Sequence, residues 1–357
     1  MRNRYLDLLR AIAVVRVVVY HSTGWMALTI AFPAMMVMFA LAGSLMAASI
    51  DRSGPLAVER RLRRLLPSLW AVSAIAVPAM LLTGLAWDWK ILYWAFPIQD
   101  PPANGWGAMT LNATWYLRDF LWFVLLSPLA LPVFRRFPKL SVSLPYVALA
   151  VITFGGLTPH PIVRDMALYG GAWLLGFAHH DGMLRRLPRR RLVAIAAGLA
   201  ALGGAWIATH PGPRGYDIND VPLGNALWSA AFVLISLGFA PLTTAARPRR
   251  LVTILNARAL TIYLWHVPII VAVTKIGEAH GLPVRGAAGI GWRFVVIVAL
   301  VSLAVLLFGW VEDFAAGRPL MLVPGGRPRR PAEAPVSPAI HPVAASHGAP
   351  VGETVPT

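Results

Sequence analysis

Residues 6–21 read LDLLRAIAVVRVVVYH, an apolar stretch with an arginine at position 10 and a histidine at position 21. Eleven residues separate them, almost three helical turns, so Arg10 and His21 fall on one helix face, roughly 16 Å apart along the axis. A positive charge and a titratable ring are costly inside a bilayer, and such residues are functional by default. The stretch therefore predicts a membrane helix that carries chemistry.

The composition predicts an integral membrane protein. Of 357 residues, 57% are hydrophobic and 13% are charged. Many segments approach the roughly 20 apolar residues that a membrane-spanning helix needs. The expected fold is all-α and polytopic, with about ten transmembrane helices. The spans are expected near 7–24, 31–49, 67–87, 114–134, 142–158, 166–180, 192–209, 222–241, 259–274 and 294–311.

The positive charges set the expected orientation. The chain has a formal net charge of +17, but its basic residues are spread over short loops and form no single nucleic-acid-binding patch. With the N-terminus inside, most of them fall in cytoplasmic segments, which is typical of membrane topology. Both termini are therefore expected in the cytoplasm, with the chain in the cell membrane. The absence of cysteine excludes disulfides, thiolate metal sites and cysteine nucleophiles.

The chain divides into a membrane domain and a tail. Residues 1–323 are expected to form the transmembrane domain. The Pro/Ala-rich segment 324–357 cannot build a core and is expected to be a disordered cytoplasmic tail. Two loops expected outside, 88–113 and 210–221, are long enough to help form a site. The small residues of FALAGSLM, around Gly43, predict close helix packing.

His21 is the candidate catalytic base. Histidine is the natural general base near neutral pH. Asp7 lies one turn before Arg10 and shares its stripe, so it can neutralise that charge. The alternative is a buried histidine bonded to a neighbouring helix, but the charged partner on the same face favours function. Arg16 is expected to point elsewhere.

An arginine-rich stretch precedes the third span, in ERRLRRLLPSLW. It is either a signal for membrane orientation or a clamp for a phosphorylated ligand, since arginine matches phosphate geometry. Residue type alone leaves these two readings near equal. The four residues are Arg60, Arg61, Arg63 and Arg64.

Further candidates lie in two later spans. In WYLRDFLWF, Arg118 and Asp119 are adjacent and about 100° apart on a helix, which makes them poor partners for each other. In TIYLWHVPII, a structural role is favoured for His266 over catalysis. No metal site is expected, because His179 and His180 are interpreted as interfacial. The residues expected to bind substrate are Trp115, Tyr116, Arg118, Asp119, Tyr263, Trp265 and His266.

Taken in order, these segments resemble the acyltransferase-3 family of integral membrane acyltransferases. That family opens with an LDxLRAxA…H segment, followed by an FFxLSG-like helix, an Arg-X-X-Arg stretch ending in LLP, and a YLWHxP helix. The corresponding segments here are LDLLRAIAVVRVVVYH, MFALAGSLM, RRLRRLLPSLW and TIYLWHVPII, and the resemblance covers about residues 3–320. Two positions of MFALAGSLM, Ala40 and Ala42, depart from the family pattern, and Asp119 does not align with the glutamate that many members carry.

The resemblance implies an O-acyltransferase with no tightly bound cofactor. Its cosubstrate would be a cytoplasmic acyl-CoA, with acetyl-CoA first among them, and its acceptor a hydroxyl of a carbohydrate or a glycosylated small molecule. It implies His21 as catalytic base, Arg10 as its essential partner with Asp7, and the arginine cluster as the binder of the CoA phosphates.

The sequence leaves two questions open: whether the protein works alone, and whether it is a transferase or a transporter. With no appended esterase-like domain, the chain is either a stand-alone transferase or one that works with a protein partner. A multi-pass transporter or flippase for a polar lipid or metabolite would also explain charges inside the membrane; absence of CoA dependence would favour it.

Overall fold

The computed structural model describes residues 3–111, 113–241 and 250–324, and its regular elements in those ranges are helices. The longer ones are α1 (Arg4–Thr23), α3 (Ala34–Ser53), α4 (Leu56–Leu82), α6 (Thr114–Arg136), α7 (Pro138–Phe154), α8 (Pro161–His180), α10 (Arg189–Thr209), α11 (Pro222–Gly238), α13 (Ala259–Ala279) and α14 (Gly286–Phe308). The short ones are α2 (Ala27–Ala31), η1 (Trp89–Trp94), α5 (Gly105–Thr110), α9 (Met183–Arg186), η2 (Ile218–Asp220), α12 (Arg250–Ala257) and α15 (Trp310–Ala315).

The expected all-helical membrane fold is confirmed in its coarser form. Each of the ten expected spans coincides with a helix, and six helical segments of the described chain are long and apolar enough to cross a membrane. Ten crossings and cytoplasmic termini stay predictions. The six are Ala27–Ser53, Leu56–Leu82, Thr114–Arg136, Arg189–Thr209, Ala259–Ala279 and Gly286–Phe308.

Local signals define both ends of α1. The Asn3 side chain accepts a hydrogen bond from the backbone N–H of Tyr5, which caps the first turn. Gly24 ends the helix in the left-handed conformation, with φ at 71°, and its N–H donates to the Tyr20 carbonyl. His21 therefore lies in the last turn of α1, at the end opposite Asp7.

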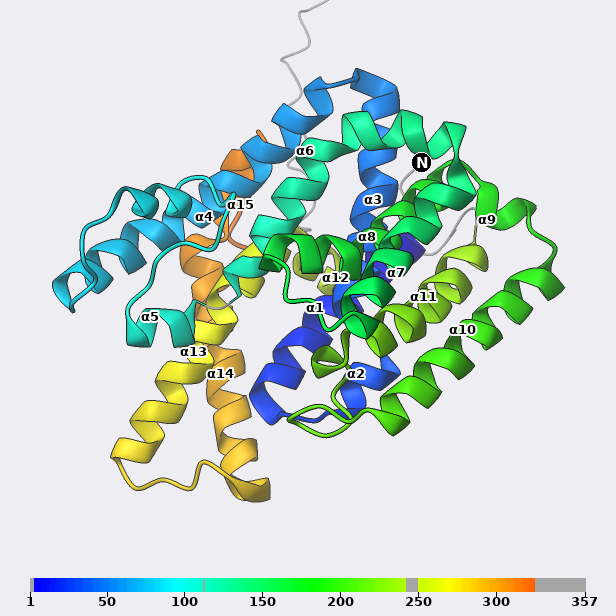
Figure 1. The fold of residues 1–357 in the computed structure, drawn as a ribbon. Coiled ribbons are helices and arrows are strands. Elements are labelled where there is room, and N and C mark those ends of the chain that lie inside the picture. Colours follow the sequence, from blue (N-terminus) through cyan, green and yellow to red (C-terminus); the bar gives the residue numbers. More distant parts are fainter. Residues whose placement is uncertain (1–2, 112, 242–249, 325–357) are drawn as a thin grey trace, which may run out of the picture. The chain divides into compact units, whose positions relative to one another are not determined.

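Helices α3 and α8 pack closely through glycines. A Cβ atom on Gly43 would lie 2.3 Å from the Trp173 carbonyl oxygen, and one on Gly176 would lie 2.1 Å from the Ala40 carbonyl oxygen. Side chains at these positions would push the helices apart, so the close packing expected around Gly43 is confirmed. In Figure 1, α10 runs beside α11 and α13 beside α14, and each pair is in contact.

The start of α4 differs from the sequence-based expectation. Helix α4 begins at Leu56, so the arginines at 60–64 lie within its first turns and not ahead of it. The charged run was interpreted as a loop, but arginine is a good helix former and extends the helix beyond its apolar part. All but the first residue of the expected tail, 325–357, lies outside the described residues.

Candidate active site

His21 lies in the wall of a cavity of about 400 Å³, here called the histidine cavity. The cavity is enclosed by the ends of α1 and α6, by α13, and by the 210–221 loop. His21 itself is exposed, whereas Tyr20 beside it is buried. The wall of the histidine cavity includes Arg16, Tyr20, His21, Trp115, Arg214, Asn219, Tyr263 and His266.

The imidazole rings of His21 and His266 meet in this cavity. Their centroids are 5.1 Å apart and the rings are perpendicular. The Nδ1 atom of His266 lies 2.6 Å from the Tyr263 carbonyl oxygen. A carbonyl only accepts, so Nδ1 carries the hydrogen and Nε2 keeps a lone pair in the neutral ring. That Nε2 is buried and has no hydrogen-bond partner among the described residues.

Residues next to His21 are anchored by the 210–221 loop. The Tyr20 hydroxyl donates to the Asp217 carboxylate and accepts from Arg214 Nη1 at 2.7 Å. Arg214 also forms a two-point ion pair with Asp220, with N–O distances of 2.9 and 2.6 Å. Its hydrogen bonds lower the pKa of the Asp220 carboxyl below its ordinary value. The loop thereby closes over the end of α1.

Arg16 lines the same cavity as His21, so the expectation that it points elsewhere is wrong. The helical spacing correctly separates the two side chains on α1. Helical spacing does not reveal which neighbouring segments surround Arg16 and His21. Those segments form the cavity that Arg16 lines.

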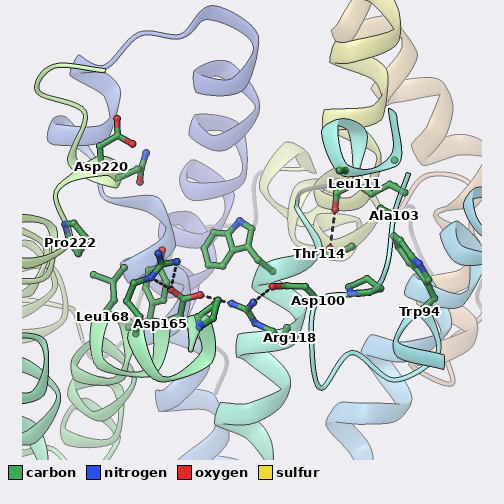
Figure 2. A pocket seen from close by; sticks show the side chains of 18 of the residues that line it. Trp94, Asp100, Ala103, Leu111, Thr114, Arg118, Asp165, Leu168, Asp220 and Pro222 are labelled. Carbon is green, nitrogen blue, oxygen red and sulfur yellow. Dashed lines mark hydrogen bonds and ion pairs between the residues drawn. The ribbon is translucent and has the colours of Figure 1, made fainter. Parts of the chain in front are cut away.

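A second cavity of about 800 Å³, here called the aspartate basin, lies between the 94–111 segment, the starts of α6 and α8, and the 213–222 segment. Figure 2 shows Arg118 in this basin, reaching Asp100 on one side and Asp165 on the other. Arg118 also pairs with its neighbour Asp119, with an Nε–Oδ1 distance of 2.9 Å. The expectation that Arg118 and Asp119 are poor partners is therefore wrong, because the long arginine side chain bends back to a carboxylate whose other oxygen has no hydrogen-bond partner among the described residues.

The two cavities share wall residues. Trp115 and Asn219 line both of them, so the aspartate basin opens beside the two histidines. The Trp115 ring stacks on Tyr169 with centroids 5.4 Å apart, which fixes its orientation. The two cavities are therefore neighbours on either side of Trp115 and Asn219.

Other residues expected to bind substrate lie away from the cavities. Tyr116 packs among Phe39 and Tyr263 in the core, and Trp265 stacks on Phe308 of α14 with centroids 4.4 Å apart. Asp119 is fully buried behind Arg118. Residue type alone could not separate these core residues from cavity residues, because both groups are aromatic or charged.

The arginine cluster and Arg10 lie toward the other end of α1. Arg61 is half-buried, donates to the Ser49 hydroxyl at 3.4 Å, and lies within electrostatic range of Arg10. Arg63 is exposed and pairs with Glu59 at 2.5 Å. Arg60 and Arg64 are also exposed. Arg61 is thus the member of the cluster that turns inward.

Neither Asp7 nor Arg10 lines either cavity.

His180 belongs to a charged group away from both cavities. Its Nε2 lies 2.8 Å from Asp51, and Arg135 bridges Asp51 and Asp181. The possible ligand atoms of Asp51, His180 and Asp181 lie within 4.8 Å of one another. Arg135 donates to both carboxylates, so the group is already balanced by a guanidinium.

Sequence reasoning did not single out several wall residues of these cavities, among them Arg16, Asp165, Arg214 and Asn219. Asp165 carried a usable signal, because it stands next to Arg164 at the start of an apolar helix. Asp100 and Asn219 lie in loops whose folding over the helices has no periodic signature.

An all-helical membrane fold with paired histidines at a cavity defines the class of protein as a membrane enzyme candidate, and comparison gives its family. The chain belongs to the acyltransferase-3 family, since the family model described as an acyltransferase domain matches residues 3–311. Membership implies a multi-pass membrane acyltransferase. Neither a curated protein nor a solved structure matches the chain.

Proposed function

We propose that this protein transfers an acetyl or short acyl group from cytoplasmic acyl-CoA to a hydroxyl of a carbohydrate or glycosylated acceptor, with His21 as the general base. The observation that carries the proposal is the exposed His21 ring in a cavity that adjoins the aspartate basin. The acceptor hydroxyl would lose its proton to His21 as it attacks the thioester.

The two ends of α1 support different parts of this function. Arg61 and Arg10 lie toward one end and suit the CoA phosphates, because guanidinium groups bind phosphate in two-point geometry. Asp7 belongs with Arg10 as a partner that balances its charge. About 16 Å of helix separate Arg10 from His21, a length that an extended thioester arm can follow.

The aspartate basin suits the acceptor. Its wall combines the aromatic rings of Trp94 and Trp115 with two carboxylates, Asp100 and Asp165, that Arg118 holds by ion pairs. Apolar ring faces and orienting polar groups are what small polyhydroxylated ligands require. His266 and Tyr263 would position the acceptor hydroxyl near His21, since both line the histidine cavity.

The test compares host cells that carry wild type, His21→Ala, His280→Ala or no copy, by untargeted mass spectrometry of glycans, lipids and secreted metabolites. His280 is the matched control because it is exposed directly after the end of α13 and lines neither cavity. We expect compounds heavier by one acyl group in wild type and His280→Ala alone. Acylated products in His21→Ala would contradict the role of His21. A compound that changes location and not mass would favour a transporter.

A further inference from the structure

Arg16 is a buried cation in the wall of the histidine cavity, and the reaction proposed above does not yet use it. Its side chain is 8% exposed. The Nε atom donates to the Leu28 carbonyl oxygen at 3.1 Å, and the guanidinium carbon lies 5.0 Å from the Tyr20 ring centroid. A main-chain oxygen and an aromatic face therefore hold the group in place.

The charge of Arg16 has no acidic partner at ion-pair distance among the described residues. Arg214, the other arginine of the cavity, is already paired with Asp220 and Asp217. No carboxylate lines this cavity in the part of the chain that the structure describes. The cavity thus holds one cation with no carboxylate at ion-pair distance among the described residues; Asp217 in the 210–221 loop acts on it only over a longer distance. A buried charge without a partner is costly, so its presence at a cavity indicates an anionic group during the reaction.

We propose that Arg16 stabilises the oxyanion formed when the acyl thioester is attacked, an inference that rests on the proposed transferase function. His21 takes the proton from the acceptor hydroxyl, and the oxygen bonds to the thioester carbonyl carbon. The π electron pair of the carbonyl moves to its oxygen, which Arg16 binds. The C–S bond then breaks, and the sulfur leaves with the proton from His21 as free CoA thiol. The products are the ester and CoA.

The charge balance favours an oxyanion over a substrate carboxylate. The acetyl thioester is neutral before attack and carries one negative charge in the tetrahedral intermediate, which matches the single available cation. A donor that is itself buried, as Arg16 is, stabilises such a charge far more than one in water. Arg16 and His21 line the same cavity and lie within electrostatic range of each other, which joint action on one substrate requires.

The experiment uses the full chain in lipid nanodiscs, with acetyl-CoA as donor and host glycan and glycolipid extract as acceptor. Released CoA is read with a thiol reagent, and the chain gives no background because it has no cysteine. The variants are Arg16→Gln, Arg16→Lys, His21→Ala and the control Arg293→Gln. Arg293 also donates its Nε–H to a backbone carbonyl, that of Gly289, but lines neither cavity. Unfolding temperatures are measured for each.

We expect Arg16→Gln to lower kcat about 100- to 1,000-fold, the usual effect of removing an oxyanion donor, with little change in KM for acetyl-CoA. Arg16→Lys should restore part of kcat, and Arg293→Gln should resemble wild type. An unchanged kcat in Arg16→Gln would overturn the proposal. So would a loss that follows a lowered unfolding temperature and is not restored by lysine, or a loss seen only as a raised KM for acetyl-CoA.

The same assay separates this inference from the function on which it rests. If the wild-type protein released no thiol from acetyl-CoA, the proposed transferase function would be contradicted, and the proposed role of Arg16 would fail with it. Full activity in His21→Ala together with loss in Arg16→Gln would overturn the role of His21 and keep that of Arg16.

Discussion

At the scale of single residues, the site depends on how partners divide the available hydrogen bonds. His266 donates its Nδ1 hydrogen to the Tyr263 carbonyl oxygen. Its Nε2, buried beside His21, has no hydrogen-bond partner among the described residues. Arg214 forms ion pairs with two aspartates, whereas the hydrogen bond of Arg16 within the described part of the chain runs from its Nε to a carbonyl oxygen. Chemically similar side chains thereby acquire different roles.

Within the arginine cluster, Arg61 is expected to matter most for the donor. We predict that Arg61→Gln raises the KM for acetyl-CoA by about ten-fold or more, because a lost charge-assisted hydrogen bond costs roughly 1.5–3 kcal/mol. Arg63→Gln should have a smaller effect, since Arg63 is exposed and already paired with Glu59. Steady-state kinetics with varied acetyl-CoA measures both. Equal KM values in Arg61→Gln and wild type would contradict the clamp.

At the scale of elements, the α3–α8 contact keeps the bundle closed beneath the site. We predict that Gly176→Ala lowers the unfolding temperature, because its Cβ would meet the Ala40 carbonyl oxygen and the Ser44 nitrogen at 2.1 and 2.7 Å. Overpacking of this kind costs about 1–3 kcal/mol. Gly198→Ala on α10 is the matched control, since a Cβ there meets nothing within 4 Å. Thermal unfolding in nanodiscs measures both, and equal unfolding temperatures would refute the packing argument.

The positions of the helices could be predicted from the sequence. Which helices and loops surround the cavities could not. Apolar runs located α6, α10 and α13 well, because burial in lipid demands length and composition that the sequence states directly. The start of α4 was missed, since charge and helix continue together there. His21 was singled out as a candidate by its place in an apolar helix, and it lies in a cavity wall. Arg16 was not, because the wall that it shares with His21 is built by distant segments.

At the scale of the whole membrane domain, the 210–221 loop joins both cavities to the end of α1. It contributes Arg214 to one cavity, Asp220 to the other and Asn219 to both. Its Asp217 and Arg214 hold the Tyr20 hydroxyl, next to His21, by hydrogen bonds. The sequence predicted a loop long enough to help form a site, but not this contact.

The lowered pKa of Asp220 leads to a prediction about the 210–221 loop. Because the Arg214 hydrogen bonds lower that pKa, the stabilising ion pair is fully present above the ordinary aspartate value of about 3.9 and is lost only as pH falls through the lowered value. Hydrogen exchange of residues 210–221, corrected for intrinsic rates, should therefore not change between pH 8 and 5. Asp220→Asn should exchange faster at both. Opening of the wild-type loop in this range would contradict the assignment.

The most direct test of the central claim supplies ¹³C-labelled acetyl-CoA to membranes that contain wild type or His21→Ala and follows the label by mass spectrometry. The account predicts labelled acyl ester on a carbohydrate-containing acceptor with wild type and background label with His21→Ala. Equal labelled ester in both membranes would contradict it.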